Sequence, residues 1–112
     1  MKGQITMNED IIPVDSYDFE ERVSSGIVLV YFYEHLNLQS RALETIIDEI
    51  AEQYCDSIKV LAADVEQSPD IAYHLGIESI PSVVIFNGGE PVEQIDGANP
   101  ISVYSDIIDD LL

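Results

Sequence analysis

The fold is decided by the stretch Gly76-Ile77-Glu78-Ser79-Ile80-Pro81-Ser82-Val83-Val84-Ile85-Phe86-Asn87-Gly88-Gly89. A short helix that begins at Ser68-Pro69 is expected to stop at Gly76, because glycine readily leaves the helical conformation. The apolar run 83–86 predicts a strand, and a second strand is predicted over 92–95. Between them the glycines of 87–90 supply the positive φ of a tight turn, so the two strands form a β-hairpin.

Two inner strands are expected earlier in the chain. The run 27–33 is continuously β-branched and aromatic, which is typical of a strand covered on both faces and places it at the sheet centre. A similar strand is predicted over 57–65. The short run 11–14 contains Pro13, which suits an edge strand.

Helices are predicted between these strands. Ser16 is expected to cap a short helix that carries Phe19 and Val23. The longest helix should begin near Asn37, since apolar residues then recur at spacings of three and four as far as Tyr54. A last amphipathic helix follows Asn99-Pro100. The order βαβαβαββα predicts an α/β fold with a mixed central sheet flanked by helices and right-handed parallel crossovers, in which only the hairpin strands need be antiparallel.

The net charge and the cysteine content exclude several classes of function. The 112 residues include 22 Asp+Glu and 4 Lys+Arg, a formal net charge of -18, which argues against a nucleic-acid partner. Cys55 is the one cysteine, so an internal disulfide or a multi-cysteine metal site is excluded. The sequence has no secretory signal and no run long enough to cross a bilayer, so a cytoplasmic protein without a membrane partner is expected. The predicted organisation is an N-terminal tail, residues 1–10, and one domain, residues 11–112.

The sequence resembles the thioredoxin family from about Ile11 to the C-terminus. The most specific match is Gly76-Ile77-Glu78-Ser79-Ile80-Pro81 with the strand and Asn-Gly turn after it. The strand 28–33, Ala63-Asp64-Val65-Glu66 and Gly97-Ala98 agree with it. The resemblance implies a thioredoxin-like fold and a cis Ile80–Pro81 bond beside the active-site helix.

The redox motif of that family is missing. Its Trp-Cys-Gly-Pro-Cys-Lys aligns with Leu36-Asn37-Leu38-Gln39-Ser40-Arg41, so neither cysteine is present. The buried aspartate of the family aligns with Tyr31 and its lysine on the next strand with Ala62. Thiol-disulfide exchange needs a thiolate and a resolving thiol. The degenerate motif 37–40 therefore predicts a protein without dithiol activity, and no catalytic residue, cofactor or metal is expected.

A peptide-binding groove remains as the implied site. Thioredoxins hold extended peptides between the active-site helix, the cis-proline loop and a glycine loop. By resemblance the groove positions here are Tyr33, Leu36, Asn37, Leu38, Ser79, Ile80, Pro81, Gly97 and Ala98. The expected partner is a protein or extended peptide, added like a β-strand near Ile80 and favoured if basic, for a monomeric chaperone or adaptor.

Four alternatives stay open. His35 and Ser40 could form a hydrolytic couple, although the helix geometry should bury Ser40. Cys55 could support an atypical oxidoreductase. Cysteine-less chaperones of hydrogenase maturation, which recognise a twin-arginine signal peptide, share part of the pattern. A structural subunit would use the surface of the fold rather than the groove.

Overall fold

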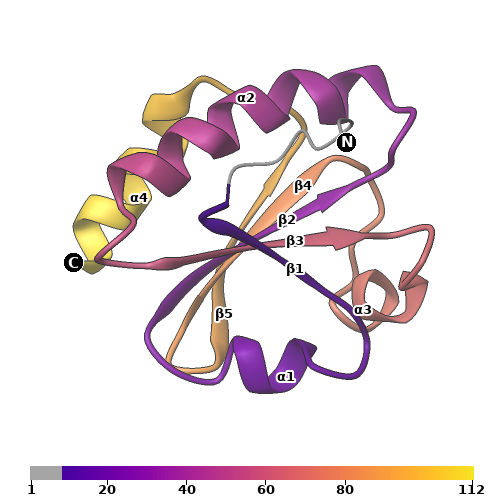
Figure 1. The fold of residues 1–112 in the computed structure, drawn as a ribbon, viewed down its shortest axis with the longest axis horizontal. Coiled ribbons are helices and arrows are strands. Elements are labelled where there is room, and N and C mark those ends of the chain that lie inside the picture. The colour runs from indigo at the N-terminus through magenta and orange to yellow at the C-terminus, as the bar shows by residue number, and fades with distance from the viewer. Residues whose placement is uncertain (1–8) are drawn as a thin grey trace.

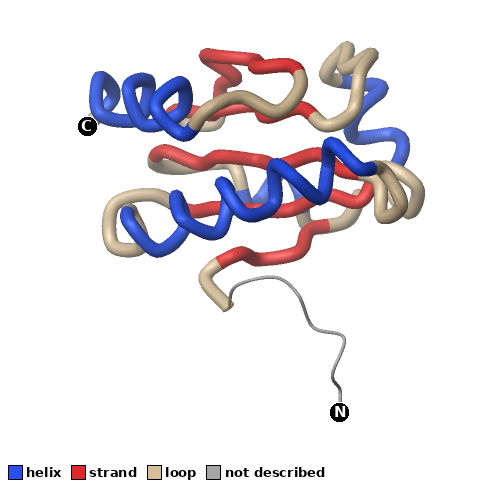
Figure 2. The backbone as a smooth tube through the Cα atoms, turned by 90° about the horizontal axis from the view of Figure 1, so that it is seen from above, coloured by secondary structure: helices blue, strands red, loops and turns tan. Residues whose placement is uncertain are grey.

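The computed structural model describes residues 9–112. One five-stranded sheet, in the order β1-β3-β2-β4-β5, is covered by α2 and α4 on one face and by α1 and α3 on the other (Figure 1). Seen from above, α2 and α4 lie along the strands on the near face (Figure 2). The predicted element order is confirmed. The elements are β1 (Ile11–Val14), α1 (Phe19–Arg22), β2 (Ile27–Tyr33), α2 (Leu38–Gln53), β3 (Lys59–Asp64), α3 (Pro69–His74), β4 (Ser82–Asn87), β5 (Glu90–Asp96) and α4 (Ile101–Leu111).

The N-terminal part of the predicted organisation is described only in part. Most of the predicted tail, residues 1–8, lies outside the described residues, and Glu9 and Asp10 form an exposed turn before β1. Among residues 9–112, no helix is both long and apolar enough to cross a membrane.

The strand β2 lies in the middle of the sheet and is buried on both faces. Leu29 and Tyr31 point into the core cluster beneath α2 and α4. Val28, Val30 and Phe32 point into a second cluster beneath α1 and α3. Since successive side chains of a strand alternate between faces, a strand with both faces covered must be apolar throughout. The central position predicted for this run is confirmed.

The sheet has one more antiparallel pair than the hairpin alone requires. β4 runs antiparallel to β2 as well as to β5, with Ser82 opposite Phe32 and Asn87 opposite Ile27. The connection through α3 returns the chain to Pro81, beside the end of β2. From there β4 can only run back along β2, so the sequence-based topology was incomplete at this point.

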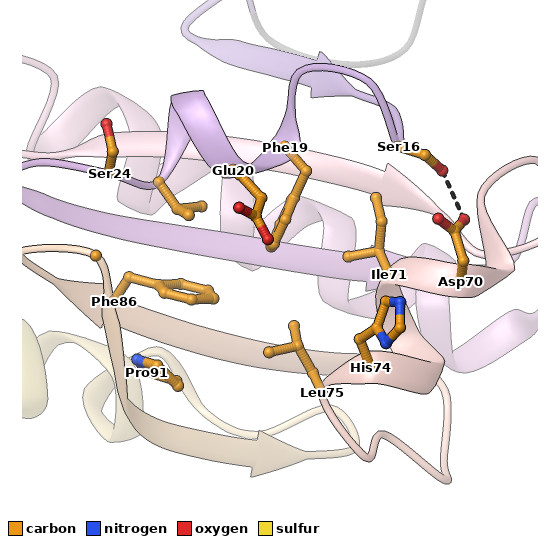
Figure 3. Close-up of a pocket in the computed structure, with 12 residues that line it drawn as sticks. Ser16, Phe19, Glu20, Ser24, Asp70, Ile71, His74, Leu75, Phe86 and Pro91 are labelled. Atoms are coloured by element: carbon orange, nitrogen blue, oxygen red, sulfur yellow. Dashed lines mark hydrogen bonds between the residues drawn. The ribbon is translucent and has the colours of Figure 1, made fainter.

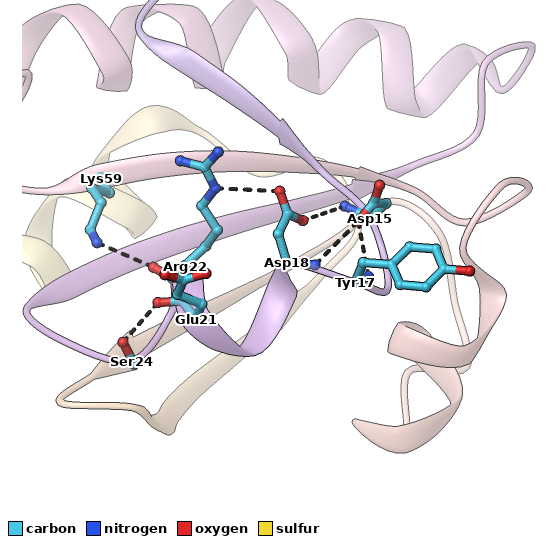
Figure 4. A network of polar contacts seen from close by, with 7 residues as sticks. All are labelled: Asp15, Tyr17, Asp18, Glu21, Arg22, Ser24 and Lys59. Atoms are coloured by element: carbon cyan, nitrogen blue, oxygen red, sulfur yellow. Dashed lines mark hydrogen bonds and ion pairs between the residues drawn. The ribbon is translucent and has the colours of Figure 1, made fainter.

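The N-cap residue of α1 is Asp18, which makes no side-chain cap hydrogen bond, so the prediction that Ser16 caps this helix is wrong. Aspartate side chains instead order the turn that precedes the helix (Figure 4). The amides of Tyr17 and Asp18 donate to Asp15 Oδ1 at 2.9 and 3.2 Å, and the Asp15 amide donates to Asp18 Oδ1 at 2.9 Å. This last hydrogen bond lowers the pKa of the Asp18 carboxyl. Arg22 Nε also forms an ion pair with Asp18 Oδ2 at 3.4 Å. An Asp side chain that accepts from amides two and three residues further on stabilises such a turn. Ser16 instead donates to Asp70 Oδ1 at 2.5 Å, which ties this loop to α3.

Tyr54 links α2 to α4 and should make stability depend on alkaline pH. The residue is buried, and its partly buried hydroxyl donates to Asp109 Oδ1 at 2.7 Å. Desolvation together with this carboxylate raises the pKa of Tyr54 to about 12. Because the folded state favours the neutral phenol, this stabilisation is complete below about pH 10 and is lost as the pH rises towards about 12. In urea unfolding, the Tyr54→Phe variant should have a free energy of unfolding about 1 kcal/mol below that of the wild type at neutral pH. Between about pH 10 and 12 the stability of the variant should fall less than that of the wild type. An equally steep alkaline loss in Tyr54→Phe would contradict this assignment.

Candidate functional site: a groove beside a cis-proline

The N-terminus of α2 and the Ile80–Pro81 loop form two walls of one site. The Ile80–Pro81 peptide bond is cis. Asn37, at the start of α2, places its side-chain nitrogen 3.5 Å from the Ile80 carbonyl oxygen. This hydrogen bond is long, near the distance beyond which such a contact no longer adds to stability. The two segments, 43 residues apart in sequence, therefore meet where the resemblance implies.

The glycine loop forms the third wall. The Gly97 amide donates to the Pro81 carbonyl oxygen at 2.8 Å, which holds the loop against the proline. Gly97 has a φ of 78°, a conformation that residues with a Cβ rarely adopt. The Gly97 carbonyl oxygen in turn accepts from Asn99 and from the Tyr104 hydroxyl, both at 3.3 Å. Tyr104 is a fully buried residue of α4, so the loop is anchored to the core.

Asn37 and Ser40 serve the local structure at the positions that hold cysteines in a dithiol motif. Asn37 is the N-cap of α2, and its Oδ1 accepts from the Ser40 amide at 2.9 Å. Ser40 is 1% exposed, and its hydroxyl oxygen accepts from the Glu34 amide at 3.3 Å. Asn is among the best N-caps, which explains its presence here. The predicted helix start and the burial of Ser40 are both confirmed.

The hydrolytic alternative finds little support in this geometry. His35 is exposed, and no hydrogen bond joins it to the Ser40 hydroxyl in the part of the chain that the structure describes. A serine nucleophile needs a base within hydrogen-bond reach and access to substrate. Neither condition is met by this buried hydroxyl.

Apolar side chains stand out from the groove at its helix end. Leu36 is 85% exposed and Leu38 is 80% exposed, and Gln39 beside them is exposed as well. Two protruding leucines on either side of Asn37 can offer apolar contacts to a ligand. Ser79 and Ala98 are also exposed, whereas Ile80 is half-buried and Pro81 is buried.

Tyr33 is half-buried and engaged in packing. Its ring stacks on Tyr31 with centroids 5.2 Å apart and packs against the core beneath α2 and α4. Burial, followed by the negative charge of Asp64, raises the pKa of Tyr33. Tyr33 therefore forms part of the supporting wall and presents little of its ring to a ligand.

Two supporting contacts were not foreseen from the sequence. The buried Tyr31 hydroxyl donates to the Ser40 carbonyl oxygen inside the first turn of α2. Burial raises the pKa of Tyr31 far above its usual value, and the charge of Glu44 adds to this. Glu34 Oε1 accepts from the Asn37 side chain at 3.3 Å, so the same residue contacts both motif positions. An acidic residue three positions before an Asn N-cap was the available signal for Glu34.

Cys55 lies far from the groove. It is an exposed free thiol in the turn that follows α2. The 16 residues of α2 separate it from the Asn37 end by roughly 24 Å at the rise of an α-helix. Cys55 cannot act on a ligand held at Ile80 without a large rearrangement.

A cis-proline loop beside a helix N-terminus, on a five-stranded mixed sheet between two helical layers, defines a thioredoxin-like fold with asparagine and serine at its dithiol positions. The family model Thioredoxin matches residues 10–110, and the chain belongs to the thioredoxin family. Thioredoxin of Staphylococcus epidermidis is 28% identical over 99 residues, covering 88% of this chain and 95% of its own length. Thioredoxin M5, chloroplastic, of Oryza sativa is 34% identical over 103 residues, which are 90% of this chain and 60% of that protein.

A solved structure supports the same fold. A mutant thioredoxin from Halobacterium salinarum, with glutamine in place of one asparagine, superposes with a TM-score of 0.83 at 26% identity, covering 94% of each chain. The fold and the family predicted from the sequence are thereby confirmed.

Proposed function

We propose that this protein is a redox-inactive member of the thioredoxin family that binds an extended segment of a partner protein in the cis-proline groove, as a chaperone or adaptor. One observation carries the proposal. Asn37 and Ser40 stand at the positions of the family's dithiol, and the three segments that the proposal makes the walls of the groove are in contact, through Asn37 to Ile80 and Gly97 to Pro81.

The chemistry of the motif supports the absence of exchange. A disulfide is opened by a thiolate, and the mixed disulfide is released by a second thiol. Asn37 has no nucleophile and is engaged in capping α2, while Ser40 is buried. The positions that would carry the acid and the base of the family hold Tyr31 and Ala62. Ala62 has no ionisable group, and burial raises the pKa of Tyr31 far above its usual value, so its phenol is a poor proton donor or acceptor near neutral pH.

The groove has the features of a peptide site. An extended ligand can pair with backbone groups of the loop at Ile80, as in β-strand addition, while Leu36 and Leu38 supply apolar contacts. The 3.5 Å contact from Asn37 to the Ile80 carbonyl is weak enough for a ligand amide to replace it. The net charge of -18 favours a basic ligand and speeds its encounter in the cytoplasm, where we expect this chain to act.

A residual redox role is the second candidate, because relatives of this chain carry the name thioredoxin and Cys55 is an exposed thiol. A chaperone of the hydrogenase-maturation type is a narrower form of the binding proposal. Its ligand would be a twin-arginine signal peptide, whose charge suits this acidic chain.

Capture from a lysate of the organism that encodes the chain tests the groove. The wild-type chain is compared with Leu36→Asp/Ile80→Asp at physiological and at high salt. The matched control is Val92→Asp/Leu112→Asp, which adds the same two charges at exposed apolar residues elsewhere. The proposal expects a partner that the groove variant loses, by about tenfold or more for two buried apolar contacts, and that the control keeps at both salt concentrations.

Two outcomes would count against the groove. Capture that survives in the groove variant but disappears at high salt would make general charge attraction the determinant. Capture that survives both changes would point to a structural subunit that uses another surface.

A further inference from the structure

A second hollow lies on the face of the sheet that α1 and α3 cover, away from α2 (Figure 3). Its volume is about 470 Å³, within the range of ligand-binding clefts. The floor is apolar and consists of buried residues, with Phe19 and Phe86 in edge-to-face contact at 5.8 Å and Ile71 beside them. We call this hollow the α1/α3 cleft. None of its lining residues belongs to the cis-proline groove.

The ionisable side chains at the rim of the α1/α3 cleft are two carboxylates and the imidazole of His74. Glu20 and Asp70 stand on opposite helices, and Figure 3 shows the Glu20 carboxylate turned toward the cleft beside Phe19. Asp70 accepts a hydrogen bond from the Ser16 hydroxyl, a neutral donor that leaves its charge in place. Neither Lys nor Arg lines the cleft. The ion pair found among residues 9–112 joins Arg22 to Asp18 and therefore involves neither carboxylate of the rim.

Two exposed tyrosines belong to the segments that border this cleft. Tyr17 is 98% exposed and Tyr73 is 82% exposed, a high exposure for aromatic side chains. Tyr17 follows Ser16 directly and Tyr73 lies one helical turn after Asp70, and the hydrogen bond between Ser16 and Asp70 holds their segments together. Aromatic faces near carboxylates attract Arg and Lys, and tyrosine is enriched among the residues that dominate interface affinity.

We propose that the α1/α3 cleft is a second docking site, for a basic segment of another protein that carries one apolar side chain between Arg or Lys residues. The apolar side chain enters between α1 and α3 onto the floor at Phe19, Ile71 and Phe86. The flanking cations lie against Glu20 and Asp70 and over the tyrosine rings. Because the rim residues are exposed, the cleft opens along its side. This shape suits a side chain that projects from a chain passing outside.

Titration of the ¹⁵N-labelled full chain with two peptides tests the proposal. The first is acetyl-Arg-Arg-Leu-Arg-Arg-amide, and the second has Gly in place of Leu, both in about 0.15 M salt so that long-range attraction is screened. The amide shifts should centre on residues 16–24 and 70–75. The Leu peptide should bind about tenfold more tightly than the Gly peptide, as burial of one leucine requires.

Charge-reversal variants locate the site. Glu20→Arg should weaken binding of the Leu peptide about tenfold, because it places a cation at the rim. Glu49→Arg is the matched control: it makes the same change at a position of α2 on the opposite face of the sheet and should leave the affinity unchanged. Leu36→Asp should also leave it unchanged, so this test and the test of the groove can fail separately.

Three results would overturn the proposal. Equal affinity for both peptides would show that the apolar floor is not used. An equal loss in Glu20→Arg and Glu49→Arg would show attraction to the net charge alone. Shifts centred on Leu36 and Ile80 would assign the peptide to the groove.

Discussion

Replacing Asn37 and Ser40 together by cysteine should give this chain a disulfide reductase activity that we expect the wild type to lack. The positions are three residues apart at the start of α2, a spacing at which two sulfurs can bond. A thiol at a helix N-terminus has a lowered pKa and is therefore partly thiolate near neutral pH. Reduction of insulin by dithiothreitol should proceed with the wild type at the rate of dithiothreitol alone, and faster with Asn37→Cys/Ser40→Cys.

The expected activity of the double variant is limited by its surroundings. Tyr31 and Ala62 stand where the family has its acid and base, and positioned proton transfer contributes about 10²-fold or more. The double variant should thus stay about 10²-fold below a thioredoxin that keeps those groups. Cys55→Ser is the control in both backgrounds. Insulin reduction by the wild type that disappears in Cys55→Ser would overturn the redox-inactive proposal.

Much of the fold follows from the sequence because its signals are local and agree with one another. The continuous apolar run of β2 requires two covered faces, and the structure supplies both clusters. The Asn-Gly-Gly turn sets the hairpin, and Asn37 marks the start of α2. The antiparallel pairing of β4 with β2 depends instead on where α3 returns the chain, which no local pattern encodes.

The resemblance implied that the start of α2, the cis-proline loop and the glycine loop lie close together. The contacts of Asn37 with Ile80 and of Gly97 with Pro81 join these three segments, while their use as a binding site stays a prediction. The role of Glu34 depends on side-chain geometry within one turn, which sequence spacing does not fix. The α1/α3 cleft could not be inferred, because a hollow arises from how two short helices leave the sheet partly uncovered. The prediction of the N-cap of α1 failed for a related reason. Ser and Asp are both good N-caps, and the sequence alone does not select between them.

The exchange at Tyr31 and Ala62 explains how the fold tolerates the loss of its redox groups. These residues are direct neighbours on β2 and β3, with Val83 on the other side of Tyr31. In the family pattern an acid faces a lysine here, whereas this chain pairs a large ring with a methyl group. The Tyr31 ring fills the space beside Ala62, and its hydroxyl donates a hydrogen bond to the Ser40 carbonyl oxygen in the first turn of α2. A position used for proton transfer has become part of the core.

Restoring the acid with Tyr31→Asp should therefore destabilise the protein by about 4 kcal/mol, because it leaves a cavity and buries a carboxylate without a cation. Tyr31→Phe keeps the ring and should cost only about 1 kcal/mol, the value of the lost hydrogen bond. Burial raises the pKa of the new carboxyl in the folded state, so its neutral form is favoured. Stability should then recover as the pH falls and decline as it rises through that pKa. Urea unfolding of both variants at about pH 5 and about pH 8 measures this. Equal, pH-independent losses in Tyr31→Asp and Tyr31→Phe would show that the ring is not needed to fill the core.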